Sequence, residues 1–187
     1  MRLVTRIYLV QHGDKLRVAG DPGLTELGMR QAAVTARWLQ DRRLQALYSS
    51  PLRRAQETAA PIASATGLAV QLETRLRERL NWDGSQTFDA FVADWDRSTR
   101  DRDFVLTNGE SSRSAAERMR AFLGGLIGRP GPIAAVGHGG ATTDLLRTML
   151  RDDVVPPRLL KKGVPACAIT TLDDLDVIEI ASTAHLS

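Results

Sequence analysis

IYLVQHG, residues 7–13, places four apolar residues directly before a polar end that contains a glycine. An apolar, β-favouring run this short between polar flanks predicts a buried strand over residues 7–10. Gln11, His12 and Gly13 therefore stand at the carboxyl end of that strand.

A second stretch, IAAVGHGG at residues 133–140, repeats the pattern. It predicts a buried strand over residues 133–136 that ends next to His138 and Gly139. Glycine beside each histidine leaves room for a substrate to approach closely.

Between and after these strands, helical and strand-like patterns alternate. Helical spacing of apolar residues, Leu27 among them, begins after Thr25, a plausible N-cap, and a second helix begins with Ser50 as N-cap and Pro51 at its first position. The predicted helices cover residues 25–41, 50–62, 110–126 and 141–150, and further strands are predicted at 46–48, 68–72, 167–172 and 177–180. This order predicts an α/β fold, a three-layer sandwich with a mostly parallel central sheet flanked by helices.

Residues 81–108 differ from the rest, being rich in Asp, Arg and aromatic side chains. We interpret them as a small helical cap inserted into a single domain over residues 1–187. Side chains such as Trp82, Phe91, Trp95 and Arg100 would then decide which substrate is accepted.

Composition narrows the possible functions. The chain has 187 residues, 43% hydrophobic and 25% charged, and a net charge of only +3, which does not argue for a nucleic-acid partner. No apolar stretch approaches the length that spans a membrane. The single cysteine, Cys167, excludes an internal disulfide, favours a cytoplasmic location and is expected to be buried and inert.

The histidines and arginines are the first candidates for chemistry. In an α/β sheet the ligand crevice lies beyond the carboxyl ends of the strands, where His12 and His138 are both predicted. The alternative is that each is a structural histidine, and His185 is expected to be a surface or tail-docking residue. Arg54, in the first turn of a helix, is predicted to bind phosphate, because a bound anion would offset its unfavourable position, whereas Arg53 is expected to be solvated.

The chain resembles the histidine phosphatase superfamily, the phosphoglycerate-mutase-like proteins, and most closely its broad-specificity phosphatase branch. The resemblance rests on motifs in the same order across nearly the whole chain. These are LVQHGD at 9–14, DPGLTELG at 21–28, SSPLRRAQETA at 49–59, LRE at 76–78, WDG at 82–84, GES at 109–111 and VGHGG at 136–140.

The resemblance implies a phosphomonoesterase that acts on a small phosphorylated substrate without cofactor or metal. His12 would be the nucleophile, Arg54 and a protonated His138 would bind the phosphoryl oxygens, and Glu78 would be the acid. Gly13, Gly139 and Gln11 would complete the substrate site. Glu78 could instead be one solvated or paired carboxylate in a charged run.

Two departures from the family pattern bear on activity. Gln11 stands where the family has arginine, so a charged donor is missing, unless Gln11 is matched to a neighbouring cation such as Lys15. The short spacing from Glu78 to Trp82 makes Asp83 an alternative acid. The rival functions are therefore a catalytically impaired phosphate-binding or regulatory protein and a phosphoglycerate-type mutase.

Overall fold

A six-stranded sheet forms the centre of the computed structural model, which describes residues 3–187; residues 1 and 2 of the predicted domain lie outside the described part. The strand order is β3-β2-β4-β1-β5-β6. The strands are β1 (Arg6–Gln11), β2 (Ala46–Ser49), β3 (Val70–Leu72), β4 (Ile133–Gly137), β5 (Ile169–Asp173) and β6 (Asp176–Ser182). Strands β1 to β4 are mutually parallel, β5 is antiparallel to its neighbour β1, and β6 is antiparallel to β5. This mostly parallel sheet confirms the predicted α/β fold.

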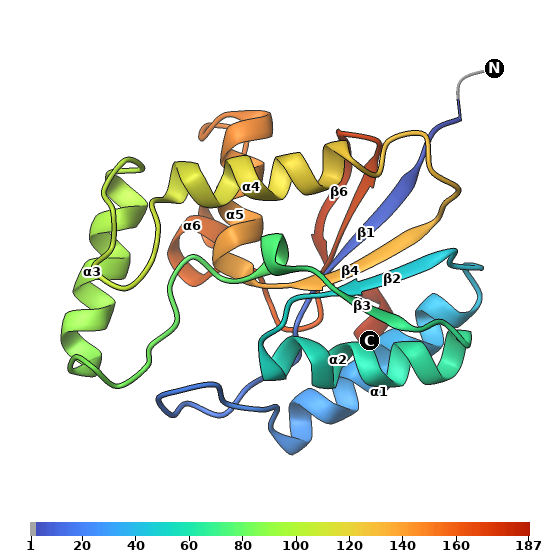
Figure 1. The fold of residues 1–187 in the computed structure, drawn as a ribbon, viewed down its shortest axis with the longest axis horizontal. Helices are drawn as coiled ribbons and strands as arrows, with labels where there is room; N and C mark the ends of the chain where they lie inside the picture. Colours follow the sequence, from blue (N-terminus) through green and yellow to red (C-terminus); the bar gives the residue numbers. More distant parts are fainter. Residues whose placement is uncertain (1–2) are drawn as a thin grey trace.

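Helices cover both faces of this sheet (Figure 1). Helices α1 (Glu26–Gln40) and α2 (Arg53–Thr66) lie on one face, and α4 (Ser112–Gly124) and α5 (Gly139–Leu150) lie on the other. The short helix α6 (Pro157–Lys162) follows α5. None of the helices in residues 3–187 is long and apolar enough to cross a lipid bilayer.

Strand β1 shows why its sequence is a continuous apolar run. Successive side chains of a strand point to opposite faces of the sheet. Ile7 and Leu9 pack in a core with residues of α4 and α5, whereas Tyr8 and Val10 pack in a second core with residues of α1 and α2. Because both faces are covered, the run is apolar on both sides instead of alternating with polar residues.

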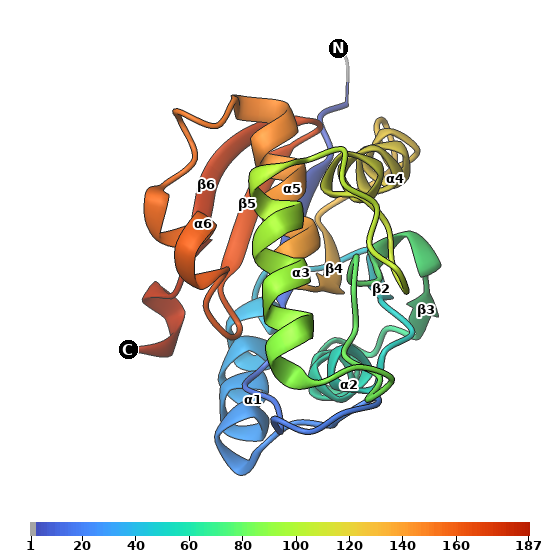
Figure 2. The same cartoon turned by 90° about the vertical axis from the view of Figure 1, so that its left-hand side faces the viewer.

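The predicted cap contains one helix, α3 (Phe88–Arg100), between two irregular segments. The side chain of Thr87 accepts a hydrogen bond from the Ala90 amide and begins this helix. Figure 2 shows α3 in front of the sheet and apart from the two helical layers. The cap therefore provides a wall that the sheet and its flanking helices do not.

The start of α2 differs from the prediction. Ser50 is not the N-cap, because its amide still donates to Val136 O (2.9 Å), as a continuation of the strand, and its hydroxyl lies 2.7 Å from His138 Nε2. The helix begins at Arg53, whose amide donates a hydrogen bond to the Asp21 carboxylate at 3.0 Å. The anion that stabilises this helix start thus comes from a distant loop.

Other differences are smaller. Leu27 is exposed, because α1 buries the face that carries Ala32, Ala36 and Leu39. Helix α6 was not predicted, since six residues are too few for a helical pattern. Its Leu159 is buried and packs in a core cluster that includes Leu146 of α5. Cys167 lies just before β5 and is buried, and burial raises the pKa of its thiol to about 11.

Candidate active site

The carboxyl ends of β1 and β4 bring the two predicted histidines together. Gln11, the last residue of β1, lies beside Gly137, the last residue of β4. His12 and His138 follow directly, and the centroids of their rings are 5.3 Å apart. The prediction that both histidines lie at one edge of the sheet is confirmed.

His12 is held in one tautomer. Its Nδ1 lies 2.7 Å from Gly13 O, and because a carbonyl only accepts, Nδ1 must carry the hydrogen. Its Nε2 then carries no hydrogen and accepts a hydrogen bond from the Gln11 amide nitrogen at 3.2 Å. Burial, followed by the positive charges of Arg54 and Lys15, lowers the pKa of His12 to about 3, so that the ring is neutral.

Arg54 lies in the first turn of α2 and is 3% exposed. Its Nη1 donates to Asn81 Oδ1 at 3.2 Å and lies 3.7 Å from Asp21 Oδ1, but its Nε has no partner. Burial lowers the pKa of this guanidinium. A buried arginine whose nearest carboxylate is 3.7 Å away is suited to bind an anion, and the role of Arg54 as a phosphate ligand stays a prediction; Arg53 is exposed, as predicted.

His138 does not match its prediction in two respects. It is fully buried and is not among the residues that line the cavity described below. Burial, then the charges of Arg54 and His12, holds its pKa well below the ordinary value, which favours a neutral ring over the expected protonated form. In this structure the His138 ring packs edge-to-face against the His12 ring.

Glu78 lies in the segment that follows β3, and its carboxylate reaches the first turn of α5. Its two carboxylate oxygens accept hydrogen bonds from the amides of Gly140 and Ala141, each at 2.9 Å. Burial raises the pKa of this carboxyl, which favours the protonated form that an acid needs. Asp83, the alternative acid, is exposed and bonded to Ser85, which lowers its pKa, and it does not line the cavity.

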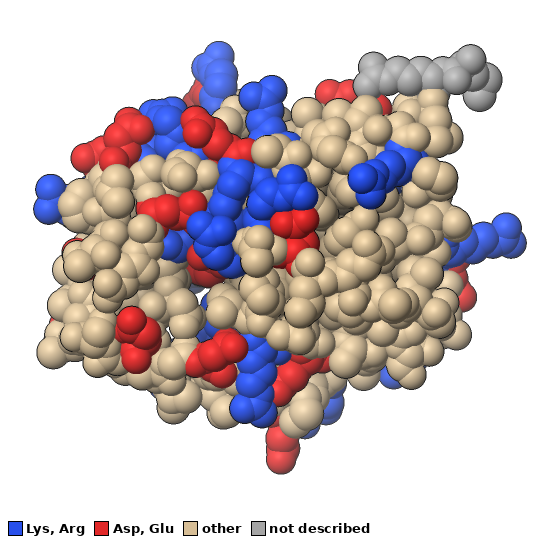
Figure 3. Space-filling view, in the orientation of Figure 1, with Lys and Arg blue, Asp and Glu red and all other residues tan. Residues whose placement is uncertain are grey.

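A cavity of about 510 Å³ joins these groups. Its polar floor includes Gln11, His12, Arg54 and Glu78, and its wall is aromatic. The wall comes from the cap and contains Trp82, Phe88, Phe91 and Trp95, whereas Arg100, expected to act in specificity, is exposed and does not line the cavity. Figure 3 shows the surface hollowed beside the cap, with charged side chains around the opening.

Two glycines of the floor are fixed by the backbone packing around them. A Cβ atom at Gly13 would lie 2.6 Å from Gly28 O, and one at Gly139 would lie 3.2 Å from Val164 N. Both glycines line the cavity as expected. Their lack of a side chain is therefore needed for close packing in addition to any role in ligand approach.

Three cations that line the cavity were not predicted to do so as a group: Lys15, Arg17 and Lys162. Lys15 had been considered only as a neighbour of Gln11. Lys162 comes from α6, whose position no local pattern indicates. Proximity in sequence to His12 was the only available signal for the other two.

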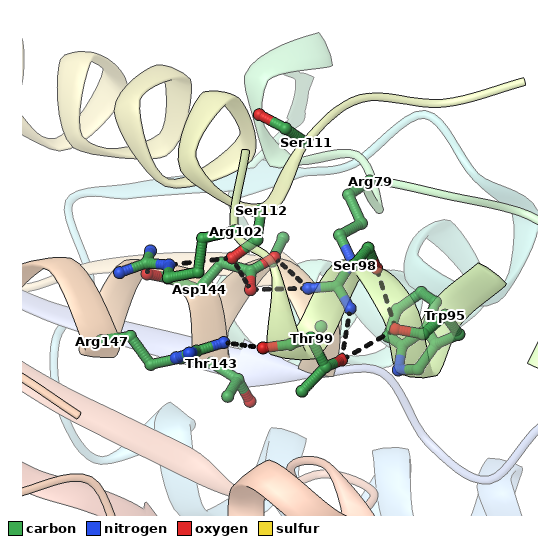
Figure 4. A network of polar contacts seen from close by, with 12 residues as sticks. Arg79, Trp95, Ser98, Thr99, Arg102, Ser111, Ser112, Thr143, Asp144 and Arg147 are labelled. Carbon is green, nitrogen blue, oxygen red and sulfur yellow. Dashed lines mark hydrogen bonds and ion pairs between the residues drawn. The ribbon is translucent and has the colours of Figure 1, made fainter. Parts of the chain in front are cut away.

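A buried polar network ties the cap to the body of the protein next to Glu78 (Figure 4). Arg79 Nη1 donates to both oxygens of Asp144, at 2.6 and 2.7 Å, and its Nη2 donates to Thr99 Oγ1 of α3 at 3.0 Å. The same guanidinium lies 4.1 Å from the centre of the Trp95 ring, and Asp144 also accepts from Ser112 at 2.6 Å. These contacts hold one wall of the cavity against α4 and α5.

His185 docks the C-terminal segment on α1. Its Nε2 lies 3.0 Å from Thr35 Oγ1, and its ring lies 5.5 Å from that of Trp38. This confirms a tail-docking role. In the part of the chain that the structure describes, no group of three or more His, Cys, Asp or Glu side chains is placed to hold a metal ion.

Comparison with known families gives a match over most of the chain. The model of the histidine phosphatase superfamily (branch 1) matches residues 7–174. A relative from Yersinia pestis, named probable phosphoglycerate mutase GpmB, is 31% identical over 207 aligned positions, which cover 97% of this chain and 94% of that protein.

Solved structures have the same fold. A mycobacterial glucosyl-3-phosphoglycerate phosphatase in complex with inorganic phosphate superposes with a TM-score of 0.77 and 28% identity over the whole of both chains. A phosphoserine phosphatase from Entamoeba histolytica, in complex with 3-phosphoglyceric acid, gives a TM-score of 0.74 at 24% identity, covering 98% of this chain and 100% of that one. The second likeness concerns the fold alone.

Proposed function

Because this chain belongs to the histidine phosphatase superfamily, we propose that it is a phosphomonoesterase that works through a phosphohistidine on His12. The observation that carries the proposal is the neutral His12, whose Nε2 carries no hydrogen and lies at the floor of a cavity that also contains Arg54 and Glu78. Few arrangements other than attack on an electrophilic centre use these three groups together.

In the first step, the Nε2 electron pair of His12 forms a bond to phosphorus while the bond from phosphorus to the ester oxygen breaks. The departing oxygen takes the proton of the Glu78 carboxyl, whose raised pKa favours its being protonated. Arg54 stabilises the negative charge on the phosphoryl oxygens. The products are an alcohol and a phosphorylated His12.

In the second step, water attacks phosphorus and gives its proton to the Glu78 carboxylate. The electron pair of the bond between nitrogen and phosphorus returns to Nε2, and inorganic phosphate leaves. His138, packed against the His12 ring, supports the orientation of the nucleophile. Because Glu78 gives a proton in one step and accepts one in the other, it ends the cycle protonated.

Each rival function rests on one observation. Gln11 provides no positive charge at the floor, which favours a phosphate-binding protein with little turnover. The relative named as a probable phosphoglycerate mutase favours a mutase, in which His12 would return the phosphoryl group to a bound phosphoglycerate.

One panel separates the three functions. Phosphate release should be measured with phenyl phosphate, phosphoserine and 3-phosphoglycerate, and the interconversion of phosphoglycerates should be followed by NMR. We expect release from the esters without interconversion, and a loss on His12→Ala of several orders of magnitude, up to roughly 10⁶-fold. Interconversion without release would identify a mutase, and phosphate binding without either reaction would identify a binding protein.

A further inference from the structure

The charge of the proposed substrate exceeds what the floor provides. A phosphate monoester carries about 1.5 to 2 negative charges at neutral pH. At the floor, Gln11 and His12 are neutral, and the pKa of the buried His138 beside them is also lowered, so Arg54 is the one cation of the floor that faces that charge. A second cation is needed for the phosphoryl group to be well compensated.

Lys15 is the cation best placed to supply it. It lines the same cavity and is half-buried, whereas Arg17 and Lys162 are exposed. Its charge contributes to the lowered pKa of His12, after burial and Arg54, and makes a smaller contribution to that of His138, after burial, Arg54, His12 and Arg118. Lys15 therefore lies close enough to His12 for its charge to act there.

Lys15 lacks a close acidic partner in the part of the chain that the structure describes. Within residues 3–187 it forms no ion pair, and its Nζ has only a long contact of 3.5 Å with Leu16 O. The neighbouring carboxylate of Asp14 accepts a hydrogen bond from Thr25 Oγ1 at 2.8 Å. Burial, then Arg54 and Arg17, lowers the pKa of Lys15, and the opposing effect of the Asp14 carboxylate is smaller than each of these.

The backbone that carries Lys15 is fixed. Lys15 pairs with Leu24 in an antiparallel bridge, and the amide of Leu16 donates to Gly23 O at 3.0 Å. On the other side, Thr25 donates to Asp14 O at 2.9 Å. Because the backbone is already ordered in the folded protein, ligand binding reduces the conformational entropy of the Lys15 side chain alone.

We propose that Lys15 is a second ligand of the phosphoryl group, which provides beside Arg54 the positive charge that Gln11 does not. This inference rests on the proposed function, because it names a residue that binds the transferred group. Lys15 donates to a phosphoryl oxygen and stabilises the charge there in the ground state and in the transition state.

The test compares Lys15→Met with Lys161→Met. Both substitutions remove one lysine charge, but Lys161 is exposed and does not line this cavity. Two quantities are measured: the affinity for inorganic phosphate by titration calorimetry, and kcat/KM for phenyl phosphate, which has no other anionic group. We expect Lys15→Met to weaken phosphate binding by about tenfold or more and to lower kcat/KM by about 10²-fold, with Lys161→Met near wild type.

Lys15→Arg should keep phosphate affinity within a few-fold of wild type, since the charge remains. Equal behaviour of Lys15→Met and Lys161→Met in both measurements would overturn the proposal. So would a loss confined to 3-phosphoglycerate, which would assign Lys15 to a carboxylate of the substrate. The calorimetric measurement needs no turnover, so it tests Lys15 even if wild type proves not to hydrolyse esters.

Discussion

Two buried arginines from different parts of the molecule have opposite surroundings. Arg79, 3% exposed, directs one guanidinium nitrogen at both oxygens of a buried carboxylate, Asp144. Arg54, equally buried, has its nearest carboxylate, that of Asp21, at 3.7 Å. The protein thus pairs Arg79 closely with a buried carboxylate, whereas Arg54 has only a longer ion pair with the half-exposed Asp21, which leaves it available for the phosphoryl group that we propose it binds.

The same contrast extends to the groups around each arginine. Four buried side-chain atoms in residues 3–187 have no hydrogen-bond partner. Two belong to residues of the cavity floor, Gln11 Oε1 and Arg54 Nε, the third is Nδ1 of the buried His138 beside the His12 ring, and the fourth is Arg79 Nε. Unsatisfied buried groups destabilise a fold, so their concentration at one place is expected of a binding site, whereas the network around Arg79 is expected to stabilise the cap.

Glu78 lies between the two regions, and its substitution should have the largest effect. Glu78→Gln keeps the shape but removes the proton, so hydrolysis of an alkyl phosphate should fall by about 10²–10⁴-fold. Phenyl phosphate has a better leaving group and should lose far less. Steady-state kinetics on both esters tests this, with Asp83→Asn as the control that should change neither; equal losses on the two esters would remove Glu78 from the role of acid.

The network predicts a loss of stability. Asp144→Asn leaves the Arg79 guanidinium buried without its counter-charge, which should lower the free energy of unfolding by about 3–5 kcal/mol. Chemical denaturation measures this. Asp153→Asn, which breaks the exposed pair with Arg151, should leave stability unchanged within error. A stability of Asp144→Asn close to wild type would contradict the assignment of this network to the support of the cap.

Arg54 predicts the opposite outcome. Arg54→Met should lower kcat/KM for phenyl phosphate by about 10²–10³-fold, the loss typical of a removed oxyanion donor. Its thermal midpoint should equal or exceed that of wild type, because a buried charge without a close counter-charge is removed. Arg53→Met is the matched control one residue away, on the exposed side of α2, and should retain activity. A strongly destabilised Arg54→Met would make Arg54 a structural residue like Arg79.

The pH dependence should reflect Glu78. The acid must be protonated to act, and burial raises its pKa above the ordinary 4.5. The ratio of kcat/KM for wild type to that for Glu78→Gln on an alkyl phosphate should therefore be largest at low pH and fall as pH rises through this raised pKa. Ionisation of the substrate cancels in the ratio. A ratio that is constant from about pH 4 to pH 8 would contradict the prediction.

The fold and the position of Arg54 could be predicted from the sequence, whereas the surroundings of Arg79 could not. Buried strands and amphipathic helices follow from local apolar patterns, and the parallel strands bring His12 and His138 together as expected. Arg54 was predicted because its position at a helix start is unfavourable without an anion. These inferences needed only neighbouring residues or the general topology of α/β sheets.

The rest depends on which distant side chains meet. Arg79 and Asp144 are 65 positions apart, and nothing local distinguishes Arg79 from the other arginines of its charged run. The state of His138 follows from complete burial beside Arg54, and the true start of α2 follows from Asp21 in another loop. Such facts are set by tertiary packing, which no local pattern encodes.

The central claim is that His12 carries the phosphoryl group during turnover. Wild type and His12→Ala should be mixed with phenyl phosphate, quenched in alkali within milliseconds and analysed by peptide mass spectrometry. The account predicts an acid-labile phosphate on the peptide that contains His12 in wild type, formed and lost at the rate of turnover, and none in His12→Ala. Turnover without this adduct, or an adduct on another residue, would contradict it.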